Sequence, residues 1–134
     1  MTGQAKLNPV RLLLPILLML TLLSMSSGPQ PDVPTPSLPH FDKLAHLLVF
    51  GLLATHLCRL YPGEETRLRH GVFAVVATSL FGLLDETRQF TNPERYFEWA
   101  DWYADTLGAL IAVAVYQRWT CYRNLLEWKP FQKR

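Results

Sequence analysis

Two short stretches place acidic and basic side chains where they could act together. Asp42 and His46 are four residues apart, and Glu86 and Gln89 are three apart, so each pair shares one face of a helix. A histidine among carboxylates suits general acid–base chemistry or the binding of a hard cation. Carboxylates interspersed with cations suit the recognition of a phosphate or of sugar hydroxyls.

A third stretch extends this pattern. Asp101 and Asp105 are four residues apart, and Lys43 and Arg95 are the cations within reach. Glu86 is the hardest to explain structurally, because it lies beside another carboxylate at the expected end of a helix, where the helix dipole disfavours negative charge. The candidate ligand-binding residues are Asp42, Lys43, His46, Glu86, Gln89, Arg95, Asp101 and Asp105.

Structural roles compete with functional ones at several of these positions. Carboxylates in the first turn of a helix complement its dipole and cap its free N–H groups. An ion-pair network that only holds three helices together is therefore the alternative interpretation of the whole cluster. We expect Asp85 and Arg88 to be lateral partners at the boundary of the membrane. A small-xxx-small stripe indicates close helix packing at Ala104, Gly108 and Ala112.

Four hydrophobic segments must position these residues, over 12–27, 44–58, 71–84 and 106–117. Each has between 12 and 16 residues, fewer than the roughly 18 to 20 of a typical spanning helix, so a soluble bundle of buried helices is the alternative. The segments lack a polar face, and aromatic residues flank the fourth at both ends. We therefore predict an all-α integral membrane bundle of four transmembrane helices with short loops.

The distribution of Lys and Arg predicts the orientation of this bundle. Alternate sides carry ten and three of these residues, which places both termini and the loop 59–70 in the cytoplasm of a bacterium. We expect a multi-pass protein of the cytoplasmic (inner) membrane. Eight of the eleven acidic residues then lie on the outer side. The net charge of +2, with no basic stripe, argues against nucleic acid as a partner.

The chain divides into four parts. Residues 1–28 form a first transmembrane helix or signal-anchor, with a cleavable signal peptide as the alternative. Residues 29–41 are a Pro-rich extracytoplasmic linker, 42–120 a three-helix membrane domain, and 121–134 a basic cytoplasmic tail. Cys58 and Cys121 lie at the cytoplasmic ends of their helices, where we expect no disulfide.

Two segments resemble a known family. "DKLAHLLVFGLL" is similar to its D-K-x-x-H-x-x-x-[FY] helix opening, and "DETRQFTNPERYFEWADWYADTLGAL" to its E-x-x-Q-x-x-x-P-x-R-x-x-x-x-x-D-x-x-x-[ND]-x-x-G signature. The chain is thus similar, over about residues 42 to 115, to the VanZ-like family of small bacterial integral membrane proteins. It departs from the family at Glu94, where glycine is usual, at Glu98, where a small polar residue is common, and at Asp105, which is often Asn. These changes make the site more acidic.

The resemblance implies an envelope protein, with a founding member associated with low-level teicoplanin resistance. Our first hypothesis is a non-enzymatic protein whose outer polar cluster binds a lipid or cell-wall precursor head group, such as a polyprenyl phosphate, with Lys43 and Arg95 contacting phosphate. The second is a membrane-embedded enzyme with His46 or Glu86 as general acid or base, or with a metal held by Asp42, His46, Glu86 and Asp101. The third is an accessory subunit of a membrane assembly. We predict no cofactor or metal and favour a non-enzymatic role; the sequence identifies no protein partner.

Overall fold

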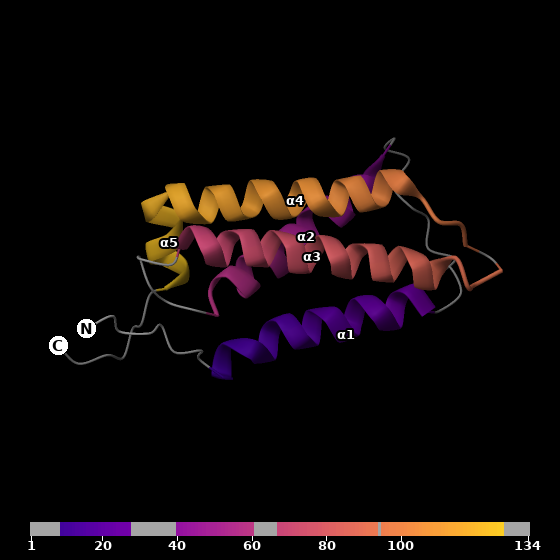
Figure 1. Ribbon diagram of the computed structural model, residues 1–134, viewed down its shortest axis with the longest axis horizontal. Coiled ribbons are helices and arrows are strands. Elements are labelled where there is room, and N and C mark those ends of the chain that lie inside the picture. Colours follow the sequence, from indigo (N-terminus) through magenta and orange to yellow (C-terminus); the bar gives the residue numbers. More distant parts are fainter. Residues whose placement is uncertain (1–8, 28–39, 61–66, 94, 128–134) are drawn as a thin grey trace.

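The computed structural model describes residues 9–27, 40–60, 67–93 and 95–127, all of whose regular structure is helical (Figure 1). This confirms the all-α class. A 3-10 turn, η1, precedes the first helix, and five α-helices follow it. Their bounds are η1 Pro9–Leu12, α1 Leu13–Ser27, α2 Phe41–Cys58, α3 Arg67–Gln89, α4 Trp99–Arg118 and α5 Thr120–Leu126.

Four long helices lie side by side, and the short α5 packs at one end of them (Figure 1). The most extensive contact joins α2 to α4, α3 packs against both, and α1 touches α2 and α3 but not α4. Trp102 of α4 donates from its indole N–H to the carbonyl oxygen of Ser79 in α3 at 3.0 Å, and the hydroxyls of Ser79 and Thr106 are 2.8 Å apart. The core is therefore the α2–α3–α4 interface, with α1 added on one side.

Glycine allows α2 and α4 to approach at backbone distance. A Cβ atom on Gly108 would lie 2.1 Å from the carbonyl oxygen of Leu47, and one on Gly51 would lie 3.3 Å from the Cβ of Ala112. Gly108 and Ala112 therefore lie at the contact between α2 and α4. Ala104 is half-buried on the same helix, one turn before Gly108.

The outer surface of the bundle is largely apolar. Leu17, Leu48, Leu80 and Leu107, one from each long helix, are all at least half exposed. A surface of this kind is suited to lipid rather than water. Three stretches are long and apolar enough to cross a membrane, namely Pro9–Ser27, Phe41–Cys58 and Arg67–Gln89. The protein is therefore a helical membrane protein with three candidate spans.

A polar network joins the two ends of the described chain. Glu127, directly after α5, accepts hydrogen bonds from Arg11 Nη2 at 2.5 Å, Arg59 Nε at 2.7 Å and the Tyr116 hydroxyl at 3.1 Å. Although burial opposes its ionisation, the hydrogen bond from Arg59 and the charges of Arg59 and Arg11 lower the pKa of Glu127. Residues 121–126, which are predicted from the sequence to begin a basic tail, thus belong to the helix α5, which packs against α4.

We expect Glu127→Gln to destabilise the protein by about 2 kcal/mol, because it removes the negative charge that two guanidinium groups share. Since folding lowers the pKa of Glu127, its contribution is fully present above the pKa of the unfolded chain and is lost as the pH falls through the folded-state pKa. Thermal unfolding in detergent at pH 7 and pH 3 measures both effects. A variant that is as stable as the wild type at pH 7 contradicts the prediction.

Several sequence predictions concern residues outside the described ranges. Residues 29–39 of the predicted Pro-rich linker 29–41, Glu94 and the tail beyond residue 127 belong to these, whereas Phe41 already lies in α2. Cys58 is buried and Cys121 is exposed, and both are free.

Candidate functional site

The charged end of the bundle, as we call it, consists of the start of α2, the end of α3 and the start of α4. Lys43 is at its margin. Its ammonium contacts Asp42 Oδ2 at 2.7 Å, Glu98 Oε2 at 2.5 Å and Asp101 Oδ1 at 2.6 Å. The ammonium donates hydrogen bonds to Asp42 and Glu98 and forms an ion pair with Asp101. Lys43 therefore links α2 to α4, and its charge is shared among three carboxylates.

His46 lies deeper in the same end. Its Nδ1 is 2.8 Å from Oδ1 of Asp105, which is 0% exposed, and its Nε2 is 3.8 Å from Oδ2 of Asp101. The ring also stacks on Phe50 of α2, with centroids 5.8 Å apart. The space for Asp105 comes from Gly82 of α3, where an added Cβ would lie 2.6 Å from Asp105 Oδ2. The pair is thus held between three helices, and Asp105 fixes the orientation of the imidazole.

Glu86 is fully buried beside this pair, and Gln89 is nearly so. The backbone N–H of Glu98 donates to Glu86 Oε2 at 3.1 Å, and Gln89 Nε2 donates to Glu86 Oε1 at 3.2 Å. The i, i+3 spacing thus predicted correctly that Glu86 and Gln89 share an inward face. Both carboxylate oxygens of Glu86 thus accept a hydrogen bond from an N–H group. The bond from Glu98 connects the end of α3 to the segment before α4.

Two groups of side chains have the composition of a metal site. Ligand atoms of His46, Glu86 and Asp101 all lie within 4.8 Å of one another, as do those of Asp42, Glu98 and Asp101. In the second group, the Lys43 ammonium already contacts all three carboxylates. In the first group, His46 Nδ1 is hydrogen-bonded to Asp105, which leaves Nε2 for a cation, an arrangement that is common in metal-bound histidines. Of these two groups among the described residues, the first is therefore the better candidate for a cation.

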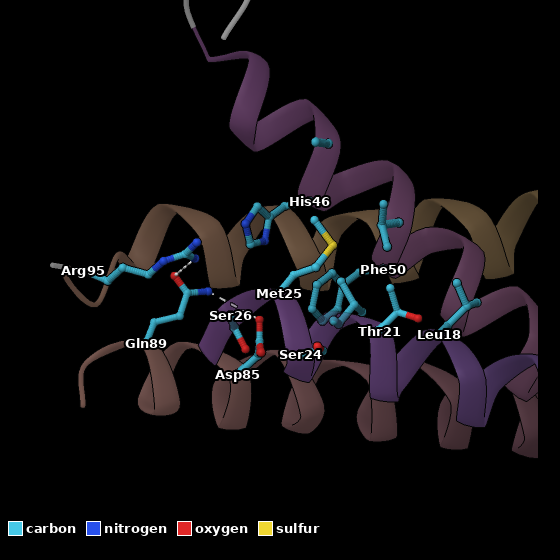
Figure 2. Close-up of a pocket in the computed structure, with 13 residues that line it drawn as sticks. Leu18, Thr21, Ser24, Met25, Ser26, His46, Phe50, Asp85, Gln89 and Arg95 are labelled. Atoms are coloured by element: carbon cyan, nitrogen blue, oxygen red, sulfur yellow. Dashed lines mark hydrogen bonds between the residues drawn. The ribbon is translucent and has the colours of Figure 1, made fainter. Parts of the chain in front are cut away.

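A cavity of about 630 Å³ lies next to these residues, between α1, α2 and α3 (Figure 2). Its walls are mostly apolar along α1 and α2, although Thr21 and Ser24 of α1 also line it, and they become polar toward the charged end. The apolar lining includes Leu18, Leu22, Val49 and Phe50, and the polar lining includes His46, Asp85, Gln89 and Arg95.

Gln89 links the two charged residues of this lining, as the dashed lines in Figure 2 show. Its amide nitrogen is 3.4 Å from Asp85 Oδ2, and its amide oxygen accepts from Arg95 Nη1 at 3.4 Å. Asp85 is 3% exposed and lines the cavity, so our expectation that it lies laterally at the membrane boundary was wrong. Arg88, its expected partner, donates instead to the Ser27 hydroxyl of α1.

Most of the sequence-predicted residues therefore converge. Lys43, His46, Asp101 and Asp105 form one connected group, and Glu86 and Gln89 lie against it from α3. Arg95 is connected to this group through its hydrogen bond to Gln89. Three groups of residues were missed: Asp85, Glu98 and the α1 residues of the cavity. The spacing of Glu98 from Lys43, 55 residues, carries no signal of their contact.

We expect Lys43→Met to destabilise the protein by about 2 kcal/mol, since it leaves the mostly buried Asp101 without its ammonium partner. The matched control is Asp42→Asn, which removes the most exposed carboxylate of the same group and should cost no more than about 0.5 kcal/mol. Thermal unfolding in detergent compares the two variants. Equal stability of Lys43→Met and the wild type contradicts the assignment.

An apolar helical bundle with a cluster of ionisable groups at one end defines a small polytopic membrane protein. The family model described as VanZ/LLP1 matches residues 3–121, and the chain belongs to this family. The match extends beyond the quoted motifs and includes α1, which forms one wall of the cavity. Neither the curated proteins nor the solved structures contain a match to the chain.

Proposed function

We propose that this VanZ-like protein binds the head group of a lipid or of a lipid-linked cell-wall precursor at its charged end. The observation that carries the proposal is the two-part lining of one cavity. Leu18, Leu22 and Val49 provide an apolar wall, while Arg95 and Gln89 provide polar groups at its end. An amphiphile has the same division, with a hydrocarbon chain on one side and a hydrogen-bonding head group on the other.

Arg95 is the cation best suited to the head group. Among the described residues no carboxylate lies within ion-pair distance of it, whereas Lys43 contacts three. A guanidinium presents its donors in a planar fork that matches phosphate oxygens. In this proposal Arg95 contacts the phosphate, and Gln89 orients Arg95. Lys43, Glu86, Asp101 and Asp105 keep the three helix ends together around His46.

The proposed topology has four spans, with α4 as the fourth. This helix has 20 residues and exposes Leu107, Leu110 and Ile111 on its outer side. The contact of Arg11 with Glu127 supports an even number of spans, because it brings the start and the end of the described chain to one end of the bundle. With the excess of Lys and Arg on that side, both termini would be cytoplasmic in a bacterial inner membrane. The charged end would then face outward, where a link to teicoplanin resistance would act.

The test is a binding assay with the protein purified in detergent and a fluorescent polyprenyl phosphate. We expect Arg95→Ala to weaken binding by at least tenfold, because it removes the charge-assisted hydrogen bonds to phosphate. Arg88→Ala is the matched control, since Arg88 is an exposed arginine in the last turn of α3 and does not line the cavity. Equal binding by the wild type and Arg95→Ala would exclude the role of Arg95.

The cluster of His46, Glu86 and Asp101 favours a second candidate, a membrane-embedded enzyme acting on such a lipid. A divalent cation held there would polarise a phosphate ester bond. Asp105 would hold His46 in the orientation that presents Nε2 to the cation. Elemental analysis of the purified protein tests this candidate. Stoichiometric metal that is lost in Glu86→Gln supports it, and metal-free wild-type protein counts against it.

A further inference from the structure

The cavity contains a buried carboxylate that the proposed phosphate contact does not use. Asp85 is 3% exposed, and its Oδ1 has no hydrogen-bond partner among the described residues. Its Oδ2 has only the amide of Gln89, at 3.4 Å. A buried carboxylate needs a cationic or hydrogen-bonding partner, because it loses the water that stabilises its charge. Within the described chain, Arg88 is the nearest cation in sequence, and it is bonded to α1.

The cationic Arg95 lines the same cavity and, like Asp85, has a buried polar atom without a hydrogen-bond partner among the described residues. Nε of Arg95 is buried without a hydrogen-bond partner in the described part of the chain, and its Nη1 reaches only Gln89. The Gln89 amide lies between the two charges, with its nitrogen toward Asp85 and its oxygen toward Arg95 (Figure 2). The two charges are therefore linked by one amide group, and each has an unused polar atom.

A head group with a single charge would fit this arrangement poorly. A phosphate ester without an ammonium would meet Arg95 favourably but would leave Asp85 without a partner. A purely cationic head group would pair with Asp85 but would leave Arg95 without a partner. A head group with both an ammonium and a phosphate would complement both residues. The ammonium would pair with the Asp85 carboxylate and the phosphate with the Arg95 guanidinium.

The helix α1 adds acceptors and hydrocarbon to the cavity. Ser26 is buried in the lining, and its hydroxyl donates to the carbonyl oxygen of Leu23, which leaves its oxygen lone pairs free to accept. Further along α1 the lining includes Leu22 and Leu18, with the hydroxyl residues Thr21 and Ser24 between and beside them. The ammonium end of a ligand would thus have acceptors around it, and its chain would lie along an apolar wall.

We propose that the cavity is selective for a zwitterionic lipid, one that has a primary ammonium and a phosphate in the same head group, with the ammonium at Asp85 and the phosphate at Arg95. This inference rests on the proposed function, which requires only that the cavity takes a lipid head group. It adds that Asp85 determines which head group is preferred.

The test measures lipid binding to the full-length purified protein by native mass spectrometry. The probes are phosphatidylethanolamine and phosphatidylglycerol with identical acyl chains, together with soluble aminoethyl phosphate. We expect phosphatidylethanolamine to bind on the order of tenfold more tightly than phosphatidylglycerol, the effect of one charged hydrogen bond. Asp85→Asn should bring this ratio close to one while phosphatidylglycerol still binds, and Asp85→Glu should retain the preference.

The outcomes separate this inference from the proposed function. Equal binding of both lipids by the wild type overturns the zwitterion inference but leaves lipid binding intact. An unchanged preference in Asp85→Asn overturns the role of Asp85. Binding of neither lipid nor of polyprenyl phosphate overturns both proposals. Binding of soluble aminoethyl phosphate as tight as that of the lipid overturns the assignment to a lipid, because the apolar wall would then contribute nothing.

Discussion

Gly108→Leu is expected to prevent stable packing of α2 against α4. Even the first carbon of a side chain at this position would lie 2.1 Å from the Leu47 carbonyl oxygen, and a backbone atom cannot rotate away. The helices would have to separate along their most extensive interface. Overpacking of a core costs from about 1 to 3 kcal/mol or more, and we expect a value at the upper end. Thermal unfolding in detergent measures it.

Gly71→Ala is the matched control for this prediction. A methyl group there would meet the amide nitrogen of Gln117, 2.0 Å away, at the far end of a flexible side chain. Gln117 can move at the expense of its hydrogen bond to the Arg67 carbonyl, so we expect a loss of about 1 kcal/mol. If the two variants are equally stable, the α2–α4 contact at Gly108 is not as close as the structure indicates.

His46→Leu is the second substitution with a large expected effect. It keeps a side chain of similar size on Phe50 but leaves the fully buried Asp105 without the partner of its Oδ1. The other oxygen, Oδ2, has no hydrogen-bond partner within the described residues, so the carboxylate would be buried and uncompensated. Removing one member of a buried charged pair typically costs about 3 to 5 kcal/mol. Unfolding measurements on His46→Leu should show a loss of this order.

A double substitution separates the charge effect from lost packing. Asp105→Asn removes the charge at constant shape, so in the His46→Leu background it should restore about 2 kcal/mol or more of the lost stability. In the wild-type background the same change should be mildly destabilising, because an amide oxygen can still accept from His46. Purely additive effects of the two substitutions would contradict the pairing.

Helical spacing was sufficient to predict which faces of α3 and α4 turn inward. Glu86 and Gln89 share a face because they are three residues apart, and Asp101 and Asp105 because they are four apart, and all four are buried. The helices are longer than the uncharged runs, since α3 continues through Asp85 to Gln89. The charged end residues are therefore part of the helix that positions them.

Spacing within one helix could not predict the role of Asp85. Adjacent residues point in directions about 100° apart, so Asp85 faces away from the direction of Glu86. Whether that direction meets lipid or protein depends on where α1 packs, and α1 is mostly apolar with no preferred apolar face. Likewise, nothing local indicates that Glu127 contacts Arg11 and Arg59, which are distant in sequence.

Photo-cross-linking in native membranes tests most directly whether an amphiphile occupies the cavity between α1, α2 and α3 with its head group at Arg95. The lipids contain a photoactivatable acyl chain, and the adducts are mapped by mass spectrometry. We predict adducts at Leu18, Leu22 and Val49 that decrease by at least tenfold in Arg95→Ala, while adducts at the outward-facing Leu80 and Leu107 stay constant. Adducts at the cavity residues that are absent in the wild type, or unchanged in Arg95→Ala, would contradict the claim.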